Sequence, residues 1–277
     1  GWPLLIYNSS WVGYGNDDMT NYCLGAERFL RHGFYDIPQP DELAGGEYAQ
    51  LYWMLSVAGQ IRFGSEQLLA YVAGITGLKT TAVFMSTLLA FALAQVTSIM
   101  ALAGGAISGR RAALIAAITL GVAPLWHAGI SYQLIAQVAG LSLLTAALVL
   151  VARTRFPGSR QGQIRWAGAS AIILAALCIH YPEVLPFLVM AWMIYTLVQV
   201  AIRKHWLPGL LPTAAMALLF IVIILRHNVV STTITLLAQV TGGLDIQASV
   251  DRASLFPYFL MPSGPAFFFG FDVFVSR

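Results

Sequence analysis

Long apolar segments constrain this chain more than any other feature. Residues 80–103 carry no charged side chain. A helix of that length reaches about 36 Å, which is enough to cross a hydrocarbon core of roughly 30 Å with some tilt. Further apolar segments follow it closely. In order, the segments are 80–103, 112–126, 132–152, 166–179, 183–202 and 208–225. Their succession predicts an all-α, polytopic membrane helix bundle of six spans.

Composition supports a lipid environment. Of the 277 residues, 58% are hydrophobic and 10% are charged, whereas a soluble domain has about 25% charged residues. The formal net charge is only +3, and no basic run is interleaved with aromatic residues. Membrane topology explains such basic residues, and nucleic-acid binding does not. We therefore expect the lipid bilayer, and no nucleic acid, as a partner.

Basic residues alternate along the bundle. They lie after the first, third and fifth apolar segments, whereas the connections 127–131 and 180–182 contain no Lys or Arg. Because positive charge favours the cytoplasmic side, the basic connections are expected to be cytoplasmic. The basic residues are Arg110, Arg111, Arg153, Arg155, Arg160, Arg165, Arg203 and Lys204.

This topology divides the chain into three parts. Residues 1–79 form an outer-face head with amphipathic surface helices, and an excess of acidic over basic residues agrees with that placement. Residues 80–225 form the transmembrane bundle. Residues 226–277, interrupted by several prolines, are expected to be an interfacial or re-entrant tail on the same outer face.

The head contains one well-marked helix at about 17–32. Apolar residues recur there at helical spacing, Asn16 or Asp17 is suited to the N-cap, and Gly33 is suited to the C-cap. Such an amphipathic helix is expected to lie along the outer membrane surface. Its apolar stripe consists of Met19, Tyr22, Cys23, Ala26, Phe29 and Leu30.

The acidic pair at the start of this helix allows two interpretations. Asp17 and Asp18 can cap the helix and complement its dipole. Alternatively, one carboxylate projects into a cavity as a general base or a metal ligand. Neighbouring helical residues diverge by about 100°, so one residue caps while the other projects. Asp18 is the better candidate for projection, with Asn21 beside it on the same face.

Two polar groups at the ends of apolar segments are further candidates. His180, Tyr181 and Glu183 join the fourth and fifth segments, and ionisable residues at membrane depth are functional candidates. The alternative places His180 and Tyr181 at headgroup level and leaves Glu183 as a helix cap. Arg226 and His227 end the sixth segment, where Arg226 suits either a lipid-linked phosphate or snorkelling to headgroups.

The head motif and the layout resemble the type C (GT-C fold) glycosyltransferases, which use polyprenyl-phosphate-linked sugars, and in particular their bacterial branch. The likeness rests on an acidic motif, the helix end Gly33-Phe34-Tyr35, a second surface helix expected from Glu47 to Gly64, and the stretch from Leu68 into the first span. The motif reads Tyr14-Gly15-Asn16-Asp17-Asp18-Met19-Thr20-Asn21-Tyr22. The family has more spans, so we expect this chain to be either part of a longer protein or a divergent relative that has lost activity.

The resemblance implies a direct displacement on the periplasmic face of a bacterial inner membrane. Asp17 or Asp18 would accept the proton of the attacking hydroxyl. The departing phosphate would need a cation, either Arg226 or a divalent metal such as Mg²⁺ or Mn²⁺ held by Asp18. The residues expected to bind substrate are Asn21, His180, Tyr181, Glu183, Arg226 and His227.

Two other functions remain compatible with the residues. The chain could be a non-catalytic scaffold that docks with other membrane subunits in a larger complex, in which case Asp17 and Asp18 would act only as caps or surface pairs. It could also be a transporter or flippase, although no internal repeat is visible and the segment interiors are nearly free of ionisable groups.

Overall fold

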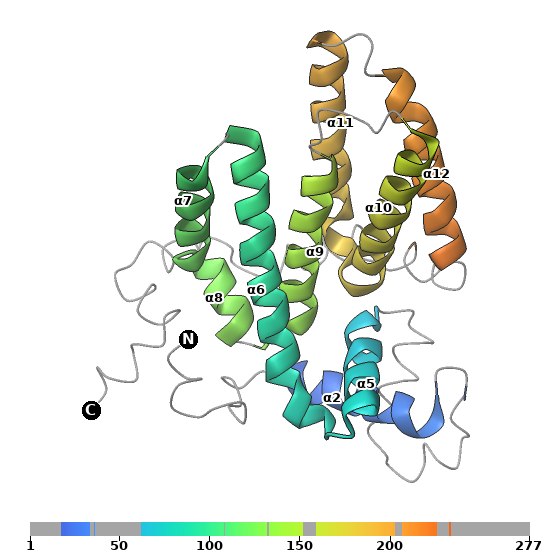
Figure 1. The fold of residues 1–277 in the computed structure, drawn as a ribbon. Coiled ribbons are helices and arrows are strands. Elements are labelled where there is room, and N and C mark those ends of the chain that lie inside the picture. The colour runs from blue at the N-terminus through green and yellow to red at the C-terminus, as the bar shows by residue number, and fades with distance from the viewer. Residues whose placement is uncertain are drawn as a thin grey trace, which may run out of the picture.

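The fold is given by a computed structural model, which describes residues 18–33, 36, 62–107, 109–131, 133–151, 159–202, 207–225 and 233. Regular structure in these residues is entirely helical, as the sequence predicts (Figure 1). The elements are α2 (Asp18–His32), α5 (Gly64–Thr76), α6 (Thr80–Ile107), α7 (Arg110–Gly121), α8 (Pro124–Ser131), α9 (Ile135–Val151), α10 (Arg160–His180), the 3-10 helix η2 (Pro182–Val184), α11 (Leu185–Ile202) and α12 (Leu207–Leu225).

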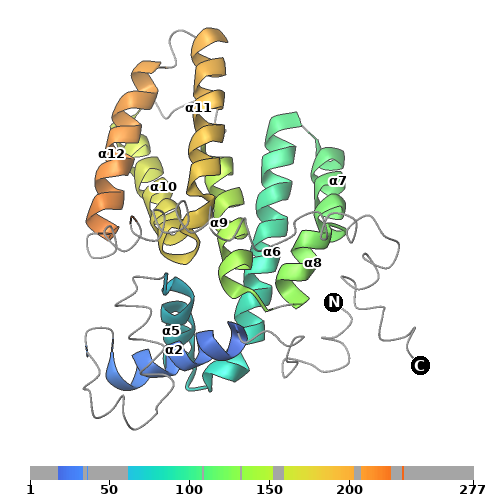
Figure 2. The same cartoon turned by 180° about the vertical axis from the view of Figure 1, so that it is seen from behind.

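Helices α6 to α12 form a bundle, and α2 and α5 lie at the end from which α6 begins (Figures 1 and 2). We call α2 and α5 the head. Helix α9 packs against both α6 and α10, and α12 packs against α10. In the bundle, α6 packs against α7, while in the head it contacts both α2 and α5. It therefore connects the two parts.

Three described stretches are long and apolar enough to cross a membrane, namely Thr80–Gly105, Arg160–His180 and Pro182–Ile202. They indicate a helical membrane protein. The apolar stretches Ile135–Leu150 and Ala214–Leu225 are shorter. Six spans were predicted, and three stretches in the described part of the chain have the length and composition needed to cross a membrane.

The second apolar segment differs from its prediction. We expected one segment at 112–126 and a connection at 127–131. Instead the chain forms α7, a break at Val122 and Ala123, and then α8. Proline is favoured at the first position of a helix and disfavoured in its interior, so Pro124 begins a new helix rather than extending α7.

The head helix predicted at 17–32 is observed as α2, and Gly33 ends it as expected. Gly33 has φ of 73°, and its N–H donates to the Phe29 carbonyl at 2.9 Å, which is a left-handed C-cap. The proposed N-caps Asn16 and Asp17 lie outside the described residues.

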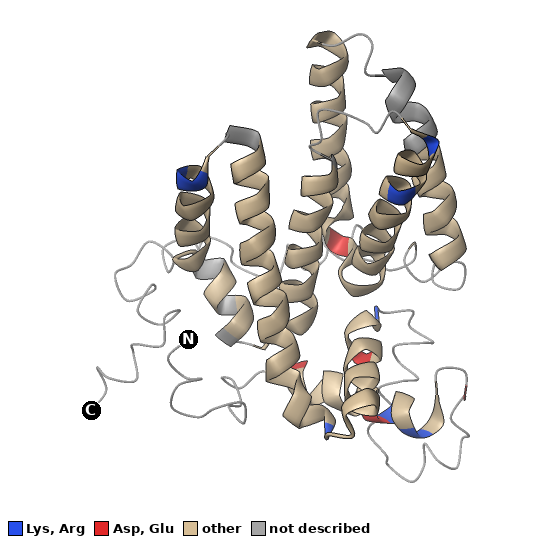
Figure 3. Cartoon of the chain, viewed as in Figure 1, with Lys and Arg blue, Asp and Glu red and all other residues tan. Residues whose placement is uncertain are grey.

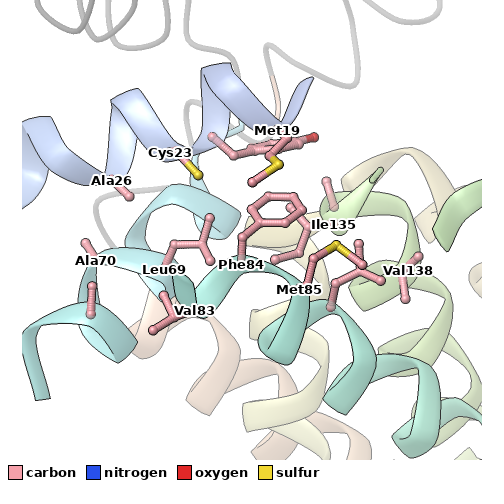
Figure 4. Packing of buried hydrophobic residues seen from close by; sticks show 14 of the residues in the cluster. Met19, Cys23, Ala26, Leu69, Ala70, Val83, Phe84, Met85, Ile135 and Val138 are labelled. Carbon is pink, nitrogen blue, oxygen red and sulfur yellow. The ribbon is translucent and has the colours of Figure 1, made fainter. Parts of the chain in front are cut away.

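Most of the apolar stripe of α2 packs against protein, and the expected position of this helix along the outer membrane surface stays a prediction. Met19, Tyr22, Cys23 and Ala26 are buried in one core with residues of α5, α6 and α9. Figure 4 shows Met19 and Cys23 directed toward Phe84 of α6. Protein therefore covers the first part of the stripe, whereas Leu30 at its end is 46% exposed.

The second surface helix, expected from Glu47 to Gly64, falls almost entirely on residues 37–61, which lie outside the description, and stays a prediction. The described helix α5 begins at Gly64 and runs to Thr76. Gly77, with φ of 67°, ends α5 before α6 begins at Thr80. The stretch from Leu68 thus leads into the first span through a left-handed turn at Gly77.

Charged side chains lie toward the two ends of the bundle. The Arg residues that begin α7 and α10 lie at the ends farthest from the head, whereas the acidic residues of α2, α5 and η2 lie in or toward the head, which also has basic side chains (Figure 3). Ser159 caps α10 by accepting from the Gly162 N–H at 3.2 Å. The alternation of basic connections in the sequence therefore corresponds to two ends of the folded bundle.

Candidate functional site

The connection between α10 and α11 lies directly against α5 and α9. A Cβ added to Gly64, the first residue of α5, would lie 2.6 Å from Cγ2 and 2.8 Å from the carbonyl of Ile179. A Cβ added to Gly140 of α9 would overlap Cβ of Tyr181 and lie 2.6 Å from its Cγ. Only glycine, which has no Cβ, allows approaches this close. Gly64 and Gly140 therefore permit Ile179 and Tyr181 to pack directly against α5 and α9.

An ion pair joins the head to this connection. Nη1 of Arg62, just before α5, donates to Oε1 of Glu183 in η2, and the side chains are 26% and 14% exposed. The Arg62 guanidinium carbon also lies 4.8 Å from the ring centroid of Tyr181. Charge-assisted and cation–π contacts strengthen as water is excluded, so this pair is a strong link between head and bundle.

His180 makes two further contacts at the same junction. Its Nδ1 lies 3.5 Å from the Ser65 hydroxyl on the first turn of α5, and its ring centroid lies 6.0 Å from that of Phe91 on α6. The last residue of α10 is therefore positioned by both the head and the longest helix of the bundle.

Tyr22 brings α2 into the same group of side chains. Burial raises the pKa of its phenol from 10.0 to about 12; the positive charge and hydrogen bond of Arg62 oppose the shift, and the carboxylates of Glu66 and Asp18 add to it. The Tyr22 ring also stacks on Phe84 with centroids 6.4 Å apart. The phenol thus remains protonated near neutral pH and can donate a hydrogen bond.

These contacts define one site, which we call the junction cluster. It combines carboxylates, a guanidinium, a protonated phenol and an imidazole where the head meets the apolar bundle. Glu66 is buried, and Asp18 is half-buried at the start of α2. The members are Asp18, Tyr22, Arg62, Ser65, Glu66, His180, Tyr181 and Glu183.

A second polar group fixes the other half of α2. The buried Arg28 donates Nη2 to the Asp36 carbonyl at 2.6 Å, and His32 Nδ1 lies 3.3 Å from the Asp36 carboxylate. The Thr80 hydroxyl donates to Glu27 Oε1 at 3.1 Å. The contacts of Arg28 and His32 tie α2 to the residues that follow it, and the Thr80–Glu27 hydrogen bond ties α2 to the start of α6.

Some of the predicted site residues come together. His180, Tyr181 and Glu183 are neighbours in the junction cluster, and Asp18 is linked to it through its charge effect on the Tyr22 pKa. Asn21 is half-buried on the same helix as Asp18. Asp17, Arg226 and His227 lie outside the described residues. Their predicted roles remain predictions.

Sequence reasoning missed Tyr22, Arg62, Ser65 and Glu66 as site residues. One signal was available, because Arg62 is the sole Lys or Arg between Arg31 and Lys79 and stands four residues before Glu66. An i,i+4 pair of opposite charge in an otherwise apolar stretch indicates a local electrostatic site.

The residues for a metal do not assemble in the described part of the chain. No group of three or more His, Cys, Asp or Glu side chains there could hold a metal ion. The expected Mg²⁺ or Mn²⁺ ligation by Asp18 therefore lacks described companion ligands, and no chemical step is derived through a metal.

Comparison with protein-family models, with curated proteins and with solved structures finds no match to this chain. The class of protein is thus defined by the fold alone. It is a helical membrane protein with a polar head at one end of its bundle.

Proposed function

We propose that the chain is a membrane glycosyltransferase that moves a sugar from a polyprenyl-phosphate donor to an acceptor on the non-cytoplasmic side. The observation that carries the proposal is the junction cluster, which combines carboxylates and a guanidinium beside an apolar bundle. A lipid-linked donor has matching parts: an apolar chain for the bundle, a phosphate that needs a cation, and a sugar presented to water.

The proposed reaction is a single displacement. The acceptor hydroxyl oxygen attacks the anomeric carbon while the bond from that carbon to the phosphate oxygen breaks. Asp18 takes the hydroxyl proton, and the polyprenyl phosphate leaves with the bonding electrons. Arg62 is the cation of the junction cluster that can offset the charge developing on the leaving phosphate. The Tyr22 phenol, kept protonated by burial, can donate to a carboxylate and hold its orientation.

The direct test is a sugar-transfer assay in proteoliposomes with defined polyprenyl-phosphate sugars. We expect Asp18→Asn to lower kcat by about 10²–10⁴-fold, the usual contribution of a general base. Thr20→Ala, an exposed change on the same helix, is the matched control and should leave transfer unchanged. Transfer that survives Asp18→Asn but not Asp17→Asn would move the base to Asp17, and transfer that survives both would rule out an Asp base in this motif.

A non-catalytic scaffold subunit is the second candidate. It is favoured by the ion pair of Arg62 and Glu183, in which two potential ligand-binding groups hold each other. This candidate requires partner subunits that co-purify at fixed stoichiometry from native membranes, with or without Asp18→Asn. An isolated chain that transfers sugar would contradict it.

A transporter is supported least. Among the described residues, the buried charged side chains are Arg28 and Glu66, and both belong to the head. The buried polar groups in the described part of the bundle are uncharged, such as Gln95, Ser142 and Thr145, whereas ion-coupled transport relies on charged groups near the midplane.

A further inference from the structure

Helix α6 is longer than a bilayer requires. Its 28 residues extend about 42 Å, which exceeds a hydrocarbon core of roughly 30 Å by about two turns. The 18 residues of α11 extend about 27 Å and fit that core without excess. Either α6 tilts strongly, or one of its ends stands outside the hydrocarbon.

The exposed side chains indicate that the part of α6 in excess of the hydrocarbon thickness is its N-terminal end. In its first two turns the exposed residues are Thr81, Ala82 and Ser86, all small or polar. The first large apolar side chain exposed on α6 is Leu93, at 66%. Beyond it, large apolar side chains are exposed on α6 and on α7, α10, α11 and α12. They include Met100, Leu114, Ile115, Ile118, Ile172, Phe187, Met193, Leu197, Leu218 and Ile223.

Two arginines indicate where the C-terminal end of α6 leaves the hydrocarbon. Arg110 and Arg111 begin α7 directly after α6 ends at Ile107, and arginine side chains favour the headgroup region over the hydrocarbon. Counting back about 30 Å from Ile107, or twenty residues, reaches Leu88. Exposure and charge therefore indicate the same boundary.

Aromatic contacts give the depth of the junction cluster relative to that boundary. Phe84 stacks on Tyr22 of α2, and Phe91 contacts His180. These two α6 residues are about 10 Å apart along the helix axis, one on either side of Leu88. Figures 1 and 2 show α6 continuing past the head-side ends of α10, α11 and α12 to reach α2 and α5.

We propose that the head-side edge of the bilayer hydrocarbon crosses α6 near Leu88. The first two turns of α6, together with α2 and α5, then stand in the headgroup layer and the water beyond it. The acyl chains cover the exposed apolar side chains from Leu93 onward and those of α7, α10, α11 and α12. The junction cluster spans the headgroup layer, with His180 at the edge of the hydrocarbon and Tyr22 on the water side. This inference does not depend on the proposed reaction.

Another boundary is physically reasonable and sets the test. Tyr71, Ile75 and Leu78 are 66%, 67% and 57% exposed, and Lys79 follows them at the turn into α6. Aromatic, aliphatic and cationic side chains of this kind also suit a membrane interface, which would put the boundary at Thr80. In that case Ser86 would lie in lipid.

The experiment uses single-cysteine variants of the full chain in phosphatidylcholine nanodiscs, with Cys23→Ala and Cys178→Ala as background. Ser86→Cys and Leu93→Cys are the matched pair, because residues seven apart share one face of a helix. Met193→Cys is the lipid reference, Arg31→Cys is the water reference, and Tyr71→Cys reports the second boundary. Each variant carries a nitroxide, and its collisions with oxygen and with a water-soluble nickel chelate are compared.

We expect Ser86→Cys and Tyr71→Cys to resemble Arg31→Cys, with nickel-chelate collisions several times more frequent than at Leu93→Cys. Leu93→Cys should resemble Met193→Cys. A Ser86 label that is as oxygen-rich and chelate-poor as the Leu93 label would overturn the proposal and move the boundary to Thr80. A Leu93 label that reads as water would overturn it in the other direction.

Discussion

Arg62 and Glu183 hold opposite charges in a place that water reaches only partly. Removing either side chain destabilises the protein, because the remaining charge is then unpaired and poorly solvated. The same pair joins residues 121 positions apart in sequence. Its contribution to stability is therefore also a measure of how firmly the head is held on the bundle.

We predict that Glu183→Gln or Arg62→Met destabilises the protein by about 1–3 kcal/mol. Denaturant or thermal unfolding in detergent measures the change. Arg31→Gln is the control, because its pair with Glu27 is 63% and 38% exposed and should contribute well under about 1 kcal/mol. The double change Arg62→Glu with Glu183→Arg should recover part of the loss. A swap no better than the single variants would argue against a direct pair.

Tyr22 makes stability depend on pH at the alkaline end. Its pKa is raised from 10.0 to about 12 by burial, and then by Glu66 and Asp18, against the opposing effect of Arg62. The native state therefore keeps a proton that the unfolded chain loses first. The contribution of the protonated Tyr22 phenol to the free energy of unfolding is complete below pH 10 and is lost as pH rises from 10 to 12.

We predict that Tyr22→Phe flattens the decline in unfolding free energy between pH 10 and 12, because phenylalanine has no proton to lose. Urea unfolding in detergent at several pH values measures this slope. Tyr71→Phe, at an exposed tyrosine for comparison, should leave the slope as in the parent. Equal slopes for the parent and Tyr22→Phe would contradict the assigned burial of the phenol.

At the scale of elements, α9 and the α10–α11 connection meet through a glycine. Replacing a helical glycine with alanine normally stabilises a protein by about 0.5–1 kcal/mol. Gly140 is an exception, because the new methyl group would overlap Cβ of Tyr181. That atom is attached to the backbone and cannot move aside by a rotamer change.

We predict that Gly140→Ala destabilises the protein by about 1–3 kcal/mol, as overpacking does elsewhere. Gly168→Ala is the matched control, since an added Cβ on that helical glycine of α10 meets nothing within 4 Å. It should be neutral or stabilising in the same unfolding assay. Two variants with equal effects would show that helix propensity, and not contact with Tyr181, determines the result.

Helix boundaries show what local sequence can and cannot predict. The end of α2 at Gly33 was predictable, because a left-handed C-cap needs only glycine at the right place. The partner of the apolar stripe of α2 was not, because a stripe of Met19, Tyr22 and Cys23 is equally suited to lipid and to protein. Pro124 is a local signal for the division of the second segment. No local pattern indicates that residues 127–131 belong to helix α8 rather than to a connection.

At the scale of the whole molecule, the chain has three layers. The arginines of α7 and α10 lie at one end, apolar helices form the middle, and the head, which has both acidic and basic side chains, lies at the other end. The junction cluster is found between the second and third layers. Any reaction that brings a lipid-linked substrate to water would meet its polar groups there.

The all-helical class and the alternation of basic connections were determined by the sequence itself. Both follow from local rules. A backbone in hydrocarbon must satisfy its own hydrogen bonds, which favours helices, and Lys and Arg side chains next to a span tend to remain on the cytoplasmic side. Only the tertiary structure decided that Arg62 meets Glu183, that Tyr22 faces Arg62 and Glu66, and that Gly140 admits Tyr181. These pairings join residues far apart along the chain, and their selection depends on three-dimensional packing and charge compensation, which no local pattern encodes.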